Sequence, residues 1–152
     1  MTENGIGQSP LRREDKRLLL GQAQFVDDIH LDHMLHGAFV RSPHPHARIV
    51  GIDATAAVAA GAALVLTAAD LPFNERPWVT RYWHDSIRGG MPRFLASDRV
   101  RFVGDPVAFV VARNRYEAED LAELVRVEYE LLPSLATMEE AMAPGAPLLH
   151  PG

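Results

Sequence analysis

Histidines are the residues of this chain that could most readily do chemistry. His30, His33 and His36 recur at every third position, a spacing that on a helix would place their imidazoles on one face, where they could bind a metal ion. Gly37 and the branched residues after it indicate instead that His36 already belongs to a strand, which would break that geometry. The sequence therefore predicts turn and surface histidines here and no metal ligand, with a histidine metal site as the weaker alternative.

The other candidate groups also lack a catalytic arrangement. Proline holds His44-Pro45-His46 rigid, but a metal bound there would need ligands from elsewhere in the chain. Ser42 lies next to this segment without the elbow motif that surrounds a nucleophilic serine. Two further histidines are isolated, namely His84 and His150. Three aspartates are expected in turns, where their carboxylates accept nearby backbone amides: Asp27, Asp28 and Asp105. The sequence predicts no catalytic, cofactor-binding or metal-binding residue.

Composition excludes several classes of protein. The 152 residues fit one domain, and the formal net charge of −5 argues against a nucleic-acid partner. The absence of cysteine removes disulfides, iron–sulfur ligation and thiolate zinc sites, and is compatible with a cytoplasmic location. No signal peptide is expected, because the basic residues near the start are followed only by Leu18–Leu20 before Gly21. The longest uncharged run, between Asp53 and Asp70, is too short to span a bilayer.

Short strands and helices that alternate indicate an α/β or α+β domain. The expected strands cover residues 35–41, 48–52, 62–67, 100–103, 107–112 and 125–131. The expected helices cover residues 54–60, 115–125 and a short stretch after 137. Segment 107–112 is apolar at every position, which is typical of a central strand buried on both faces.

Helix ends are marked by capping residues. Asp53 and Asn114 are expected to cap the first two helices, and Gly61 to end the first. Thr137 and Glu140 have the spacing of a capping box for the last one.

Residues 72–97 interrupt this pattern with prolines and glycines, yet they carry many aromatic side chains. A loop of about 25 residues is uncommon in a compact domain unless it is functional or disordered. Its rings either pack on the domain's own core or cover a partner surface, since Trp and Tyr are favoured at the centres of interfaces. The rings concerned are Phe73, Trp78, Tyr82, Trp83 and Phe94.

Six phrases, in this order and spacing, resemble the large subunit of the molybdenum hydroxylases, which include xanthine dehydrogenase, aldehyde oxidase and aerobic carbon monoxide dehydrogenase. The longest is Ala38–Ile49, with the sequence AFVRSPHPHARI. The others are residues 13–29, Leu66–Pro72, Arg101–Ala108, Ala118–Ala122 and Val127–Pro133. Each phrase alone is weak, but their shared order covers residues 12–150 and is closest to the carbon monoxide dehydrogenase-like branch.

The resemblance implies an α+β fold, the α/β hammerhead, with a mixed β-sheet and short flanking helices. The hammerhead domain is expected over residues 12–150, and the composition at either side indicates a flexible lead over 1–11 and a tail at a domain junction over 151–152. The complete enzymes of the family carry molybdopterin, usually as the cytosine dinucleotide in bacteria, and add an iron–sulfur subunit and a flavin subunit with FAD. None of the family's pterin-contacting or catalytic residues can be carried over to this chain, because those motifs lie in the longer portion that follows this domain.

Two hypotheses result from the sequence. In the first, the chain is the N-terminal structural domain, or a split subunit, of a molybdenum hydroxylase, and packs against the pterin-binding domains and the iron–sulfur partner. In the second, it is a free-standing binding module that recognises a protein through the aromatic loop 72–97.

Overall fold

A computed structural model describes residues 7, 9, 11–74 and 93–150 of the chain. The chain divides into two compact units, Met1–Met34 and Leu35–Gly152. In the first unit, the short helix α1 (Asp15–Leu19) and the 3-10 turn η1 (Val26–Asp28) bury no residue. The Asp28 carboxylate accepts the Phe25 amide at 2.9 Å, so this aspartate stabilises a turn as the sequence predicts.

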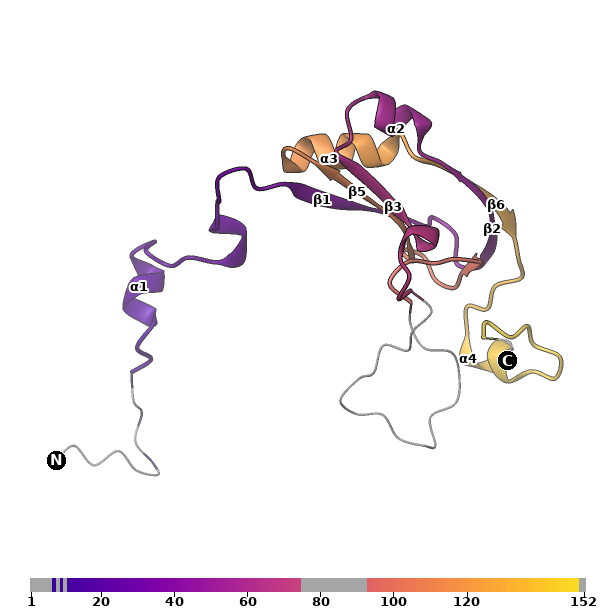
Figure 1. Cartoon of the computed structure of the whole chain (residues 1–152). Helices are drawn as coiled ribbons and strands as arrows, with labels where there is room; N and C mark the ends of the chain where they lie inside the picture. Colours follow the sequence, from indigo (N-terminus) through magenta and orange to yellow (C-terminus); the bar gives the residue numbers. More distant parts are fainter. Residues whose placement is uncertain (1–6, 8, 10, 75–92, 151–152) are drawn as a thin grey trace. The chain divides into compact units, whose positions relative to one another are not determined.

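The second unit contains two three-stranded sheets (Figure 1). The first has the order β1-β5-β3, with β1 at His36–Arg41, β5 at Pro106–Ala112 and β3 at Leu64–Thr67. The second has the order β4-β2-β6, with β4 at Arg99–Val100, β2 at Ala47–Asp53 and β6 at Arg126–Leu131. The helices described in this second unit are α2 (Thr55–Ala59), the 3-10 turn η2 (Ala68–Asp70), α3 (Arg115–Glu123) and α4 (Met138–Met142).

The predicted α+β class is confirmed, and β5 is the central strand of its sheet as expected. The mixed sheet of the prediction is corrected in one respect: all strand pairs among the described residues are antiparallel. The physical reason lies in the connection through α2, because β2 and β3 enter different sheets. A parallel pair would require both strands of such a crossover to join the same sheet.

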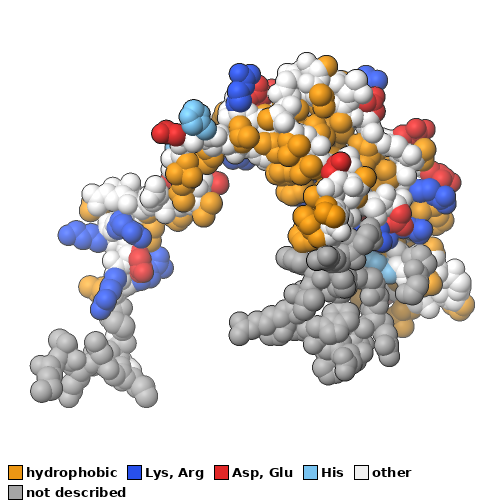
Figure 2. Space-filling view, in the orientation of Figure 1, with side chains coloured by type: hydrophobic (Ala, Val, Ile, Leu, Met, Phe, Trp, Pro, Cys, Tyr) orange, Lys and Arg blue, Asp and Glu red, His pale blue; other side chains and the backbone are white. Residues whose placement is uncertain are grey.

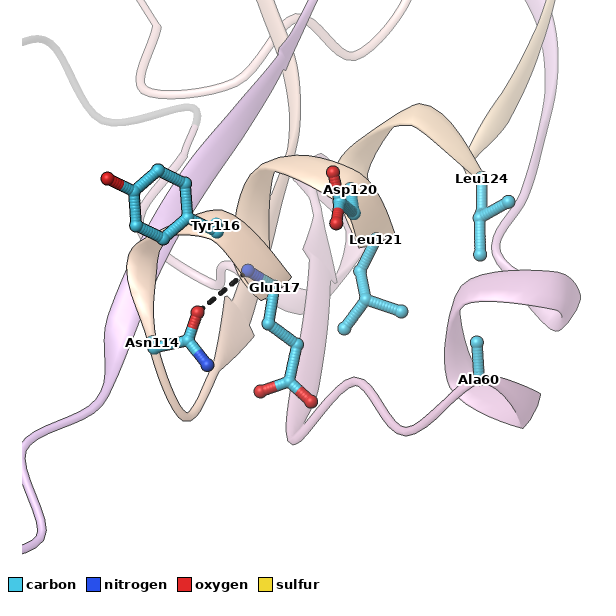
Figure 3. A pocket seen from close by; sticks show the side chains of 7 residues that line it. All are labelled: Ala60, Asn114, Tyr116, Glu117, Asp120, Leu121 and Leu124. Carbon is cyan, nitrogen blue, oxygen red and sulfur yellow. Dashed lines mark hydrogen bonds between the residues drawn. The ribbon is translucent and has the colours of Figure 1, made fainter.

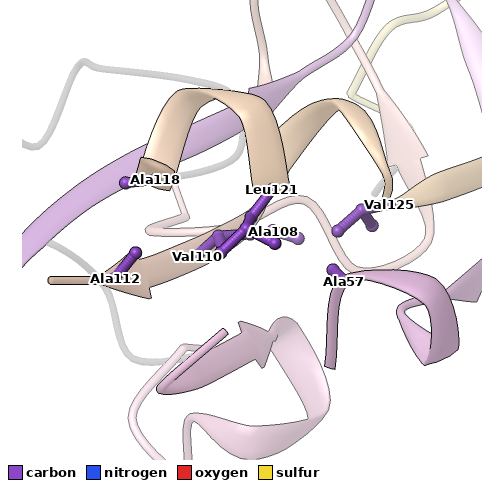
Figure 4. Packing of buried hydrophobic residues seen from close by; sticks show 7 residues of the cluster. All are labelled: Ala57, Ala108, Val110, Ala112, Ala118, Leu121 and Val125. Carbon is purple, nitrogen blue, oxygen red and sulfur yellow. The ribbon is translucent and has the colours of Figure 1, made fainter. Parts of the chain in front are cut away.

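The larger core cluster lies between α3 and the first sheet (Figure 4). From β5 it takes Ala108, Val110 and Ala112, whose side chains alternate onto one face of the sheet. From α3 it takes Ala118 and Leu121, which share one stripe of the helix, and α3 contacts both β1 and β5. The same cluster continues through Ala57 and Val125.

A second, smaller cluster packs around the other sheet. It consists of Ala47, Ala96, Val100 and Val107, so one residue of β5 points away from α3 and into this second core. Ile52 and Val127 contact both clusters and thereby join them. The two cores together fix the two sheets to each other within this unit.

Two of the predicted helix caps are confirmed and one is displaced. The Asn114 side chain accepts the Glu117 amide at 2.9 Å, and Thr137 forms a capping box with Glu140. The Asp53 carboxylate accepts the Thr55 amide at 2.9 Å, but Ala54 occupies the cap position, so the predicted cap was wrong by one residue.

The predicted strand 100–103 is wrong in length, because β4 ends at Val100. The chain turns there: Gly104 has a φ of 95°, a left-handed conformation that favours glycine. The Asp105 carboxylate also accepts the Arg101 amide at 2.9 Å, which removes that donor from a strand ladder.

Candidate interaction site

The three histidines with helical spacing do not share a helix. His33 has a φ of 62°, in the left-handed region, and His36 begins β1 as the sequence predicts. Among the described residues, no group of three or more His, Cys, Asp or Glu side chains could hold a metal ion.

The segment Ser42–His46 forms the turn that leads from one sheet to the other. The buried Ser42 hydroxyl donates to the His44 carbonyl at 2.9 Å and accepts the His44 amide at 3.0 Å. The Ser42 amide donates to the Asp105 carbonyl, and the Gly104 amide donates back to the Ser42 carbonyl. The hydroxyl is therefore occupied in a turn, which fits a structural role and not that of a nucleophile.

His46 joins the start of β2 to the exit of β6, which lie at the same end of the second sheet. Its Nδ1 lies 2.7 Å from the carbonyl oxygen of Pro133, and since a carbonyl can only accept, Nδ1 carries the proton. The Leu132 amide donates to the His46 carbonyl at 3.0 Å, so both main chain and side chain hold the exit of β6. The ring of His44 meets Tyr129 edge-on at 5.1 Å, and burial raises the pKa of the Tyr129 hydroxyl. The histidines of this motif thus order the junction between strands.

Near β4, a cluster of charged residues contains two aspartates whose pKa values are shifted in opposite directions. Burial alone would raise the pKa of Asp98, but hydrogen bonds and charge from Arg99, Arg101 and Arg93 outweigh it and lower that pKa to about 2. Burial raises the pKa of Asp105, although the Arg101 amide and guanidinium oppose the change. Arg101 also donates to the carbonyls of Leu149 and Arg99, at 3.2 and 3.1 Å. Asp105 is a turn residue, as predicted.

The predicted aromatic loop lies mostly outside the described residues, including Trp78, Tyr82, Trp83 and His84. At its two described ends, Asn74 and Leu95 exchange a pair of hydrogen bonds at 2.9 Å, in which the buried Asn74 amide bonds to both backbone groups of Leu95. Phe73 and Phe94 meet edge-on at 5.4 Å. The stem of the loop is therefore held together, while the role of its central rings stays a prediction.

A groove of about 550 Å³ lies between α3 and the end of α2 (Figure 3). Its polar groups are already used in part: Asn114 caps α3, and Glu117 pairs with Arg113 at 2.9 Å, a hydrogen bond that lowers the pKa of the glutamate. The groove offers carboxylates and the Tyr116 hydroxyl beside apolar side chains. Its lining residues are Ala60, Asn114, Tyr116, Glu117, Asp120, Leu121 and Leu124.

The first sheet presents a second surface on the side opposite α3. Strand register places Phe39 and Leu66 on either side of Phe109, and Leu64 beside Val111. These side chains alternate with those that enter the α3 core, so they lie on the opposite face of the sheet. We call this surface the open face and define it by these five residues: Phe39, Leu64, Leu66, Phe109 and Val111. In Figure 2, hydrophobic side chains gather on the side of β1, β5 and β3 that faces away from the helices.

The apolar run 107–112 predicts burial on both faces of the strand, and the structure corrects part of that prediction. On the face of β5 that carries Val107, Phe109 and Val111, only Val107 is fully buried, by packing against the second sheet. Phe109 and Val111 are half-buried. The open face was missed because no single strand reveals it. The available signal was the pair of apolar residues Leu64 and Leu66, which alternate with Val65 on an edge strand.

Residues 20–133 match the family described as aldehyde oxidase and xanthine dehydrogenase, a/b hammerhead domain. The chain belongs to this hammerhead family. The carbon monoxide dehydrogenase large chain of Afipia carboxidovorans is 46% identical over 148 residues, which cover 96% of this chain. The xanthine dehydrogenase molybdenum-binding subunit of Escherichia coli O157:H7 is 36% identical over 137 residues and 87% of the chain. The crystal structure of the aldehyde oxidoreductase from Desulfovibrio desulfuricans covers 96% of the chain with a TM-score of 0.86 and 30% identity.

This hammerhead chain spans only a small part of those relatives. It covers 18% of the Afipia and Escherichia chains and 17% of the Desulfovibrio chain. The recognised family and the hammerhead fold are thus confirmed, and the matched region is one domain of a much larger polypeptide in each relative. Within the part of the chain that the structure describes, no helix is long and apolar enough to cross a membrane.

Proposed function

We propose that this chain is the structural hammerhead domain of a molybdenum hydroxylase large subunit, as part of it or as a split subunit. The observation that carries the proposal is coverage: about 96% of the chain corresponds to 18% of a carbon monoxide dehydrogenase large chain. The domain extends over residues 12–150, with a lead over 1–11 and a junction at 151–152. Its role is to pack against the pterin-binding domains and to offer surface to an iron–sulfur subunit.

The complete assembly supplies the redox chemistry. It contains molybdopterin in the cytosine dinucleotide form, with iron–sulfur clusters and FAD on partner subunits, and acts in the cytoplasm. The described residues provide no donor set for a metal ion, since no three of their His, Asp and Glu side chains come together and their buried serine and aspartate are used in turns. We therefore assign no reaction step to any residue that the structure describes. What the residues of this chain do is hold two sheets in a fixed relation through the two cores, while the His46–Pro133 contact ties β2 to β6 within the second sheet.

Affinity purification of the tagged chain from its native cells tests the proposal. We expect a pterin-binding chain to co-purify in a fixed ratio, with molybdenum detected by elemental analysis, or the same polypeptide to continue into pterin-binding domains. Recovery of the chain as a free monomer or homodimer that never associates with such a chain would reject the proposal. It would favour the alternative of a free-standing binding module.

A further inference from the structure

The open face is a continuous apolar surface on an otherwise well-packed sheet. Phe39 is 46% exposed and Leu64 is 47% exposed, on strands that lie on either side of β5. Between them, Phe109 and Val111 are half-buried, and Leu66 lies opposite Phe109. Scattered apolar residues are ordinary on protein surfaces, but a contiguous apolar patch marks an interaction site.

Packing within the sheet gives the open face a defined shape. The Phe109 ring lies directly over Gly37, so closely that a Cβ built on that glycine would be 2.1 Å from the ring. Phe39 packs against the same ring, with centroids 4.7 Å apart and planes tilted by 53°. The two rings therefore support each other on the strand backbone before any partner arrives. A preformed aromatic surface loses little conformational entropy on binding, which favours tight association.

Arg41 gives the open face a polar end. Its guanidinium carbon lies 5.1 Å from the centre of the Phe39 ring, and its Nη1 donates to the Gly104 carbonyl at 2.9 Å. These contacts orient the planar group and leave further N–H donors for a partner. The surface that would complement this arrangement is apolar, with a carbonyl or carboxylate oxygen opposite Arg41.

We infer that the open face is the surface on which the pterin-binding remainder of the large subunit packs. This inference rests on the proposed function and adds the docking surface to it. The choice of occupant comes from size. The chain covers 18% of each of the Afipia and Escherichia relatives, so more than four-fifths of each relative lies outside the matched region. Burial of the open face by that remainder would also complete the two-sided burial that the apolar strand β5 indicates.

Site-specific photocrosslinking tests the docking surface in the assembled protein. The photoreactive residue p-benzoylphenylalanine replaces Leu64 on the open face or, as a matched control, Leu124 beside the groove, which is 40% exposed. Each variant is produced in native cells, irradiated and analysed by mass spectrometry. We expect crosslinks from position 64 to peptides of the pterin-binding domains, and few or none from position 124.

Substitution gives a second, quantitative measurement. Leu64→Glu places a charge in the proposed interface and should weaken association with the pterin-binding portion on the order of tenfold or more, measured by co-purification of a separate chain or, in a continuous polypeptide, by release of the domain after proteolysis, whereas Leu124→Glu should leave the association nearly unchanged. Circular dichroism of each variant confirms that it is folded.

The outcomes separate failure of the docking surface from failure of the proposed function. Crosslinks to the pterin-binding domains from position 124 alone would overturn the docking surface and leave the proposed function standing. Crosslinks from position 64 to a second copy of the chain, or to its own residues 1–34, would overturn the docking surface in favour of that occupant. If neither position reaches a pterin-binding domain and none co-purifies, both inferences fail.

Discussion

The two faces of the β1-β5-β3 sheet have similar apolar composition and different surroundings. On one face, Ala108, Val110 and Ala112 are buried beneath α3. On the other, Phe109 and Val111 are half-buried, and Phe39 and Leu64 beside them are about half exposed. The larger side chains thus lie on the less covered face. A domain that buried its own core completely would be expected to do the reverse, because burial of large apolar side chains stabilises it most.

This difference indicates that the two faces have different roles. The α3 face holds the domain together, and its small residues let the helix approach the sheet closely. The open face contributes less to the stability of the isolated chain, which leaves its aromatic side chains available for association. Comparison of matched substitutions on the two faces tests this separation.

The largest effect is expected from Leu121→Ala, which removes a 5%-exposed side chain from the core beneath α3. The free energy of unfolding should fall by about 2–5 kcal/mol, because the variant loses apolar burial and leaves a cavity. Urea unfolding followed by circular dichroism measures it. The control is Leu64→Ala on the open face, where we expect a loss below about 1 kcal/mol. Equal losses at both positions would contradict the distinction between the faces.

A smaller effect is expected from Gly37→Ala, which adds a methyl group beneath the Phe109 ring. The ring is the free end of a half-buried side chain and can move aside, so the free energy of unfolding should fall by only about 1–2 kcal/mol. Gly51→Ala is the control, since an added Cβ there meets no atom within 4 Å. If Gly37→Ala and Gly51→Ala have the same stability in urea, Phe109 does not rest on the Gly37 backbone.

Weakening of the covering helix itself should have an effect of about 1 kcal/mol. Asn114→Ala removes the side chain that accepts the Glu117 amide at the start of α3, without any change in the sheet. Thr137→Ala removes the equivalent bond to Glu140 in α4, which buries no residue, so its effect on thermal unfolding should be smaller. A larger effect for Thr137→Ala would show that α4, rather than α3, carries the stability of this unit.

The smallest effect, below about 1 kcal/mol, is expected from Asp98→Asn, away from both faces. The pKa of Asp98 is about 2 in the folded chain against an ordinary 3.8, so the ionised carboxylate stabilises the fold above pH 3.8. This stabilisation is lost as the pH falls from 3.8 through 2. The carboxylate is half exposed and screened by solvent, which keeps the effect small. Urea unfolding at pH 7 and at pH 2 should show a difference from the parent chain only at pH 7.

Asp105→Asn serves as the control for that pH dependence, because the pKa of Asp105 is shifted in the direction opposite to that of Asp98. Burial raises the pKa of Asp105, so its contribution to stability is present at low pH and decreases as the pH rises through the raised pKa. Asparagine keeps an oxygen that can accept the Arg101 amide. We therefore expect little loss at pH 7, and a loss there larger than that of Asp98→Asn would contradict the assigned pKa directions.

The helix caps and the turn around the candidate site could be predicted from the sequence. Asn114 and the Thr137–Glu140 pair were recognised as caps because capping depends on contacts within one turn. Asp105 was recognised as a turn residue for the same reason. The limits of β4 were not predicted, since Val100 ends a strand only because Gly104 turns the chain and Asp105 captures the Arg101 amide. The open face was not predicted either, because it combines residues from three strands distant in sequence.

The sequence alone determined the periodic elements, the local caps and, through its ordered phrases, the family to which the chain belongs. These follow from contacts within a few residues or from the pattern of side chains along one segment. Only the tertiary structure decided that β2 and β3 join different sheets, that the Ser42–His46 turn is held by Asp105 and Pro133, and that one face of β5 stays open. The physical reason is that strand pairing and burial depend on residues far apart in the chain. An apolar strand sequence predicts that both faces will be buried, but it does not indicate which residues or which partner will bury them.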